Sequence, residues 1–281
     1  MFIKLITGLT LIFATTVGPV WATVAEDAGL IIIVGNGPEL PTIERLARAF
    51  EKGHVGSVVD IQWDQYSDPI ALVRSGHAQV AVTGRAAPNL TAAPIAWDGI
   101  AVVVYSANPT KEVTTQQVAA IFSGKVTRWA ELSGQGTVIQ LIDRPRNQNI
   151  RQSFEEVLGI VEQIPKATKV VHSDQIAMST VAGNVSAVTY TSLAVALDAV
   201  KYGVDVNVLM IDQVEAAKET VRDGRYKLRR PVLLLFRKEP PAVVDAFVAF
   251  ALSEEGRAIV DEMFVAYRPE QQVERQVAKE R

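Results

Sequence analysis

The stretch VAAIFSGKVTRW, residues 118–129, joins an apolar helical run to a basic turn that ends in a tryptophan. Thr114-Thr115 stands just before it, and hydroxyl side chains at such a position cap the first turn of a helix. Ser123-Gly124 follows the last apolar residue, and glycine commonly ends a helix because it adopts the left-handed conformation without steric cost. The stretch therefore predicts a helix that begins after the threonines and runs to Phe122.

Short apolar runs alternate with helical segments on both sides of this stretch. The runs expected to be strands are residues 30–34, 57–63, 78–83, 100–105, 137–142, 186–190, 206–211 and 231–236. The segments expected to be helices include residues 43–50, 69–75, 153–158, 241–252 and 254–264. This alternation predicts a mainly parallel sheet covered by helices, and either one large domain or two lobes with a shared waist satisfies it.

The composition limits the class of protein. The chain has 281 residues, is 48% hydrophobic and carries a formal net charge of −3, which is typical of a packed globular protein. It has no tract of basic residues with interleaved aromatics, so we expect no nucleic-acid partner. Cysteine is absent, which excludes disulfides, a thiol nucleophile, cysteine metal sites and a lipid-bearing cysteine.

Residues 1–22 have the pattern of an export signal. Lys4 supplies the positive start, residues 5–20 are apolar, and cleavage is expected after Ala22. An uncleaved membrane anchor is the alternative, but the apolar stretch is short for a span of about 20 residues and contains glycine and proline. We therefore expect a periplasmic protein without a lipid anchor.

Five segments together resemble the PstS-like group of type II periplasmic binding proteins, the phosphate-binding receptors of ABC importers. They are GNGPELP (35–41), AQVAVTGR (78–85), WDGIAVVV (97–104), the stretch quoted above, and YKLRRPVLLLF (226–236). The third of these is similar to the family's x-D-G-I-A-V-I-V. The quoted stretch is the most specific match, because it resembles the pattern L-x-x-I-F-S-G-K-I-x-x-W.

The resemblance implies an α/β fold of two lobes, each a mixed sheet flanked by helices, with two hinge crossings. Residues 23–104 with 230–281 would form one lobe, and residues 105–229 would form the other lobe with the return segment. A small ligand would be captured in the interlobe cleft, and the lobes would close by hinge motion. The implied partner is an inner-membrane ABC permease or sensor, and we expect a monomer without a cofactor or metal.

The anion loop of the second lobe departs from the family pattern R-E-E-G-S-G-T-R. The corresponding residues 144–151 read RPRNQNIR, so both arginines are kept while the serine, glycine and threonine are replaced. An isoleucine side chain cannot donate a hydrogen bond. Both arginines either contact the ligand or form ion pairs. The candidate ligand-binding residues in this loop are Arg144, Asn147, Gln148, Asn149 and Ile150.

The loops of the first lobe also depart from the family pattern in ways that disfavour an anion. Pro38 deletes a backbone donor, and Glu39 would place a negative charge near an anion unless it is protonated or turned outward. The second loop is DQYSD, residues 64–68, and the third is Thr-Gly-Arg in place of Ser-Ser-Arg. The candidate ligand-binding residues in these loops are Asn36, Gly37, Glu39, Leu40, Tyr66, Ser67, Thr83, Gly84 and Arg85.

These replacements predict a solute receptor whose ligand is phosphate or another oxyanion or, because hydroxyl donors are lost, a different small organic solute. Each charge-assisted hydrogen bond contributes about 1.5–3 kcal/mol, so several lost donors would weaken phosphate binding strongly. The alternative is a protein–protein interaction or envelope-assembly module without ligand capture. An enzyme is not expected, because no G-x-S-x-G elbow, P-loop or dinucleotide fingerprint occurs. We interpret Trp63 as a core residue, Asp174 as a helix-start charge and His172 as a solvated or capping residue.

Overall fold

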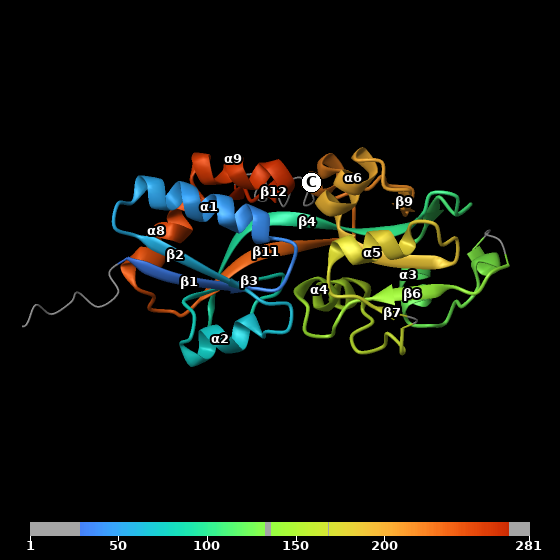
Figure 1. The fold of residues 1–281 in the computed structure, drawn as a ribbon, viewed down its shortest axis with the longest axis horizontal. Coiled ribbons are helices and arrows are strands. Elements are labelled where there is room, and N and C mark those ends of the chain that lie inside the picture. Colours follow the sequence, from blue (N-terminus) through green and yellow to red (C-terminus); the bar gives the residue numbers. More distant parts are fainter. Residues whose placement is uncertain (1–28, 133–135, 168, 270–281) are drawn as a thin grey trace, which may run out of the picture.

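A computed structural model describes residues 29–132, 136–167 and 169–269, which form two α/β lobes lying end to end (Figure 1). The expected export signal, residues 1–22, lies outside the described residues. Among the residues that are described, no helix combines the length and the apolar composition that crossing a bilayer requires.

The first lobe, at the left of Figure 1, is a mixed sheet with helices on both faces. Its elements are β1 (Leu30–Gly35), α1 (Leu40–Gly53), β2 (Val58–Trp63), α2 (Pro69–Ser75), β3 (Val80–Thr83), the first part of β4 (Thr91–Tyr105), β11 (Arg229–Phe236), α8 (Ala242–Ala251), α9 (Glu254–Met263) and β12 (Val265–Ala266). The strand order is β2-β1-β3-β11-β4, with β1 parallel to β2 and β3. Helices α1, α8 and α9 bury one apolar face of this sheet, and α2 buries the other.

The second lobe is built around the sheet order β4-β8-β6-β7 and has a separate hydrophobic core. Its elements are β5 (Glu112–Val113), α3 (Thr115–Phe122), the 3-10 turn η1 (Trp129–Leu132), β6 (Gln140–Asp143), α4 (Asn149–Leu158), β7 (Lys169–Val170), α5 (Asp174–Val181), β8 (Ala187–Ser192), α6 (Leu193–Lys201), β9 (Val206–Val208), β10 (Met210–Ile211) and α7 (Lys218–Arg222). In its core, the rings of Phe154 and Tyr190 stack with centroids 3.9 Å apart, and Phe122 packs edge-on against both.

Strand β4 belongs to both lobes. Its first part pairs with β11 from Thr91 to Gly99, and its second part pairs with β8 from Ile100 to Val104. The expected strand 100–105 is therefore only the second half of a 15-residue strand. The expectation of a mainly parallel sheet is wrong at this junction, because β4 is antiparallel to β11, β8 and β9.

Local sequence signals explain several helix ends. The hydroxyl of Thr114 accepts a hydrogen bond from the amide of Gln117, whose side chain in turn accepts one from the amide of Thr114, so α3 begins with a capping box. Helix α2 ends at Gly76, which has a φ of 86°, a conformation that glycine adopts without strain. Helix α4 begins at Asn149, earlier than the expected start at Ser153, so the anion loop is shorter than its sequence suggests.

Candidate functional site

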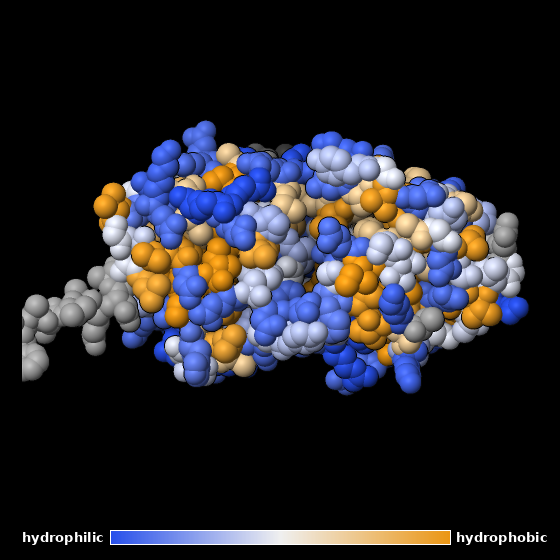
Figure 2. Space-filling model, in the orientation of Figure 1, coloured by the Kyte–Doolittle hydropathy of each residue, from blue (hydrophilic) through white to orange (hydrophobic). Residues whose placement is uncertain are grey.

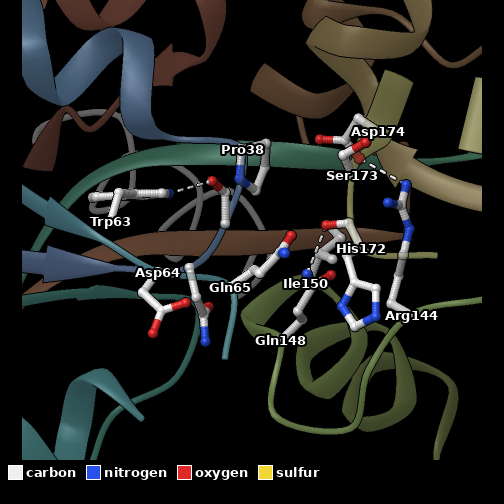
Figure 3. A pocket seen from close by; sticks show the side chains of 12 residues that line it. Pro38, Trp63, Asp64, Gln65, Arg144, Gln148, Ile150, His172, Ser173 and Asp174 are labelled. Carbon is white, nitrogen blue, oxygen red and sulfur yellow. Dashed lines mark hydrogen bonds and ion pairs between the residues drawn. The ribbon is translucent and has the colours of Figure 1, made fainter. Parts of the chain in front are cut away.

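A cavity of about 330 Å³ lies between the lobes, and loops from both lobes form its walls (Figure 3). The molecular surface is hollowed near the middle of the face seen in Figure 2, between the two halves. The residues that line the cavity are Asn36, Gly37, Pro38, Trp63, Asp64, Gln65, Arg144, Gln148, Ile150, His172, Ser173 and Asp174. They follow the ends of β1, β2, β6 and β7, and the carboxyl ends of strands are the usual ligand position in open α/β sheets.

Arg144 is the cation of the cavity wall. Its side chain is 1% exposed, and its Nη2 atom lies 2.7 Å from Oδ1 of Asp174. The Nε atom of the same guanidinium is buried and has no hydrogen-bond partner. A buried donor without a partner is costly, so this atom is a local defect in the packing around Arg144.

Aromatic and amide groups form much of the remaining wall. Trp63 donates from Nε1 to the carbonyl oxygen of Gly37 at 2.9 Å, and Gln148 donates from Nε2 to the carbonyl oxygen of His172 at 2.8 Å. The rings of Tyr66 and His172 approach from opposite lobes, with centroids 5.0 Å apart. The cavity thus offers flat apolar surfaces beside a few polar groups.

Side-chain amides connect the two lobes directly. Asn36 donates from Nδ2 to the carbonyl oxygen of Asn147 at 2.9 Å, and its Oδ1 accepts from the backbone amide of Asn149 at 3.1 Å. Asn147 donates from Nδ2 to the carbonyl oxygen of Gln65 at 3.1 Å. These bonds hold the loops of the first lobe close to the start of α4.

A buried charge cluster lies beside these amides. Nη2 of Arg230 lies 2.6 Å from Oε1 of Glu39 and 2.9 Å from Oδ2 of Asp98, and all three side chains are buried. Ser192 donates to Oδ1 of Asp98 at 2.9 Å, and Asn149 donates from Nδ2 to Oε1 of Glu39 at 3.3 Å. Glu39 is turned inward, so the expectation that it might face outward is wrong: the buried guanidinium and the amide hold it in place.

The electrostatics of the cluster follow from its burial. Burial raises the pKa of Asp98 to about 6, although Arg230 and the hydrogen bond from Ser192 act in the opposite direction. For Arg230, burial lowers the pKa, but Glu39 and Asp98 outweigh it and the net shift is upward. The guanidinium therefore stays charged while one of its two carboxyl partners titrates near neutral pH.

The second arginine of the anion loop forms ion pairs. Nη1 of Arg151 lies 2.6 Å from Oδ2 of Asp143, and its Nε lies 2.9 Å from Oε1 of Glu155. Nη1 also donates to the carbonyl oxygen of Arg144 at 2.8 Å. Arg151 thereby fixes the shape of the loop between β6 and α4 and faces away from the cavity.

The candidate residues from the sequence separate into three groups. Asn36, Gly37, Arg144, Gln148 and Ile150 line the cavity. Glu39, Gly84, Asn147 and Asn149 take part in the contacts between the lobes. The remaining candidates do not line the cavity, although Tyr66, Ser67 and Arg85 also contact the second lobe; they are Leu40, Tyr66, Ser67, Thr83 and Arg85.

Residues of the third group have contacts of their own. Ser67 accepts through its carbonyl oxygen from Nδ2 of Asn36 at 3.2 Å, and Tyr66 is 66% exposed, with its ring next to that of His172. Thr83 is buried, and Leu40 is the half-buried first residue of α1. Arg85 lies 3.8 Å from Glu156 and lines a separate surface hollow.

Several cavity residues are absent from the sequence-based candidates. Asp174 lies in the first turn of α5, as expected of a helix-start charge, and it also holds Arg144. Trp63 packs on the core, as expected, and also forms part of the cavity wall. His172, expected to be a solvated or capping residue, is half-buried and lines the cavity. Each follows a strand end, but β7 has only two residues, so its end leaves almost no pattern in the sequence.

The two lobes, the shared strand and the cleft at the strand ends define a periplasmic binding protein. A family model described as "PBP superfamily domain" matches residues 22–255, so the chain belongs to that superfamily. Within it, the chain is a PstS-like type II periplasmic binding protein, in agreement with the resemblance of its motifs. Members of this group are binding proteins rather than enzymes.

Named relatives agree with this assignment. Over 113 residues the chain is 33% identical to the phosphate-binding protein PstS 2 of Streptococcus agalactiae, an alignment that covers 38% of this chain and 39% of that relative's length. A Clostridium perfringens substrate-binding protein solved with bound phosphate is 28% identical, with a TM-score of 0.75 over 85% of this chain and 100% of that one. An ABC-type phosphate transport receptor from Vibrio cholerae is 25% identical, with a TM-score of 0.73 over 84% and 99%.

Proposed function

We propose that the protein is a solute receptor that captures a small ligand between its lobes and presents it to an inner-membrane ABC permease or sensor. The observation that carries this proposal is the interlobe cavity, to which both lobes contribute polar groups and whose wall includes the guanidinium-bearing Arg144. Cavities of this size, at strand ends between lobes, suit a small molecule. The relatives named for phosphate binding or transport support the same role.

The ligand that the cavity favours is a small organic solute with polar and apolar parts. Two carboxylates, Asp64 and Asp174, line the cavity, and the guanidinium of Arg144 is already paired with one of them. Two like unit charges 4 Å apart repel by about 4 kcal/mol at an effective dielectric constant of about 20, so a phosphate dianion beside either carboxylate is disfavoured. Amide groups and the Trp63 ring suit an uncharged or zwitterionic solute instead.

Native mass spectrometry of protein isolated from its own host tests this proposal, because a receptor retains a bound small molecule. Titration calorimetry with inorganic phosphate is the second arm, and we expect no binding below millimolar concentration. Submicromolar phosphate affinity would overturn the assignment of an organic ligand. The variant Arg144→Gln should lose the retained molecule, whereas Arg128→Gln, an exposed arginine of the second lobe, should keep it.

We also propose that residues 1–22 are removed on export and that the mature chain works in the periplasm as a monomer. The predicted cleavage pattern supports export. The intact mass of the protein from an osmotic-shock fraction, together with its size by analytical ultracentrifugation, tests both statements. A mass that includes residues 1–22 would contradict cleavage.

A protein–protein interaction or envelope-assembly module is the second candidate. It is favoured by the direct bonds between the lobes, such as that from Asn147 to the carbonyl oxygen of Gln65, because such a protein needs no ligand to hold its lobes together. Small-angle scattering before and after removal of any bound molecule by partial unfolding and refolding separates the two. A receptor binds the removed molecule again when it is added back, with a change in the scattering profile, whereas a ligand-free module neither binds it nor changes shape.

A further inference from the structure

We propose that Glu39 is a resident anion, that is, a carboxylate of the protein itself that fills the position between the first turns of α1 and α4. It joins the lobes without a ligand. It also excludes free inorganic oxyanions from that position. The exclusion of oxyanions deepens the proposed receptor function and rests on it. The bridge itself does not depend on that function. Glu39 is thus a specificity-determining residue.

The geometry around Glu39 is that of an anion position. Glu39 is the residue before α1, and its carboxylate accepts from the side chain of Asn149, the first residue of α4, so it lies beside the starts of two helices although no cap hydrogen bond joins it to α1. Helix N-termini carry partial positive charge and favour anions. The second, independent observation is Arg230, a fully buried guanidinium whose Nη2 lies 2.6 Å from Oε1 of Glu39 and whose Nη1 has no partner.

Two glycines beside the Glu39–Asn149 pair are closely packed against it. A Cβ atom added to Gly37 would lie 2.2 Å from Oε2 of Glu39. One added to Gly84 would lie 2.8 Å from Oδ1 of Asn149, the oxygen that accepts from the Gly84 amide at 2.5 Å. Both glycines let the backbone approach these side chains closely, so Glu39 and Asn149 are packed against backbone that has no space for even a methyl group.

Electrostatic repulsion also disfavours a further anion at this position. With Glu39 and Asp98 ionised, two carboxylates share the single guanidinium of Arg230, which leaves one net negative charge beside the two helix starts. In the absence of Glu39, a free anion bound at this position would supply the same negative charge. A phosphate ion arriving next to Glu39 would meet a carboxylate instead of a vacant cationic position.

Truncation of the side chain tests the proposal by chemical rescue. The variant Glu39→Ala vacates the carboxylate position, so its radius of gyration in small-angle scattering should increase in phosphate-free buffer. Formate at tens of millimolar should restore the compact form, whereas chloride at equal ionic strength should not. Phosphate should bind to the variant about ten-fold or more tighter than to the wild type in titration calorimetry. The matched control is Glu44→Ala, which removes a half-exposed carboxylate of the same helix.

Three outcomes would overturn the proposal. They are wild type that binds phosphate as tightly as Glu39→Ala, a Glu39→Ala variant that stays compact without added anion, and a wild type that is open in phosphate-free buffer. The small-angle scattering of the wild type in phosphate-free buffer needs no variant, so it tests the link between the lobes even if Glu39→Ala does not fold. Glu39→Gln, which keeps the volume and removes the charge, then serves as the second variant.

The experiment also separates this proposal from the receptor function. If native mass spectrometry finds no retained molecule while formate and phosphate act on Glu39→Ala as expected, the receptor function fails and the resident anion stands. If a retained organic molecule is found while Glu39→Ala is indifferent to formate, the resident anion fails and the receptor function stands.

Discussion

Asn149 and Glu39 form a hydrogen bond across the boundary between the lobes, with Nδ2 of the amide 3.3 Å from Oε1 of the carboxylate. Both side chains are buried. The asparagine stands where the pattern of the PstS-like group has a glycine, which has no side chain to make such a bond. The replacement therefore converts a loop position into a direct link between the lobes.

Asn149→Ala should loosen that link. The change leaves the Gly84 amide without its acceptor and Glu39 with one donor fewer, so the free energy of unfolding should fall by about 1–3 kcal/mol. Urea denaturation and small-angle scattering measure the loss and the accompanying increase in radius of gyration. Asn184→Ala is the control, because it removes an amide bond to Gln140 inside one lobe. It should lower stability at constant radius, and equal radii for both variants would contradict the link.

Asp174→Ala should cost more than an exposed substitution because it leaves Arg144 buried without its carboxylate. Breaking a buried ion pair by removing one partner typically costs about 3–5 kcal/mol, and the value here should lie near the lower figure because Asp174 is partly exposed. Guanidinium denaturation measures the loss. Asp198→Ala, an exposed carboxylate on α6, should change stability by no more than about 0.5 kcal/mol. A loss at Asp174 of that same small size would show that Arg144 is not held by this pair.

Asp98 should make the stability depend on pH. Its pKa is raised in the folded protein from 3.8 to about 6, so the folded state binds the proton more tightly than the unfolded state. Its stabilising contribution is therefore complete below about pH 4 and is lost as the pH rises through about 6, a loss on the order of 3 kcal/mol. The unfolding free energy of wild type minus that of Asp98→Asn should decrease over this interval. A constant or increasing difference would contradict the raised pKa.

Gly37→Ala should disturb the charge cluster by steric crowding alone. The new methyl group would lie 2.2 Å from Oε2 of Glu39, so the carboxylate must move away from Arg230, and we expect a loss of about 1–3 kcal/mol in unfolding free energy. Gly53→Ala is the matched control. It lies in the last turn of α1 with no atom within 4 Å of an added Cβ, and it should be neutral or stabilising by up to about 1 kcal/mol. Thermal unfolding of both variants measures the difference.

Much of the fold could be predicted from the sequence because its signals are local. The hydroxyl cap at Thr114 and the helix over residues 69–75 were predicted from local residues, and the structure confirms both. The motif segments predicted the family and the two-lobed fold, and both predictions are confirmed. The limits assigned to each lobe stay a prediction, as do the ligand-binding roles of the candidate residues.

The arrangement of the site could not be predicted because it depends on contacts between distant segments. Nothing near Glu39 in the sequence indicates that Arg230 will lie beside it, so its inward orientation appears only in three dimensions. Asp174 resembles any acidic residue at the start of a helix until the fold brings it to Arg144. Trp63 both packs on the core and lines the cavity, and a pattern of alternation cannot distinguish these roles.

The unbroken strand β4 determines how the two halves of the molecule can part. Gly99 pairs with Arg229 of β11, and the adjacent Ile100 pairs with Ser192 of β8. The pairing partner of β4 therefore changes between two consecutive residues, with no loop between them. Rotation of one half against the other must be absorbed as torsion along the ribbon. Any change in the angle between the halves must therefore bend or twist β4 itself.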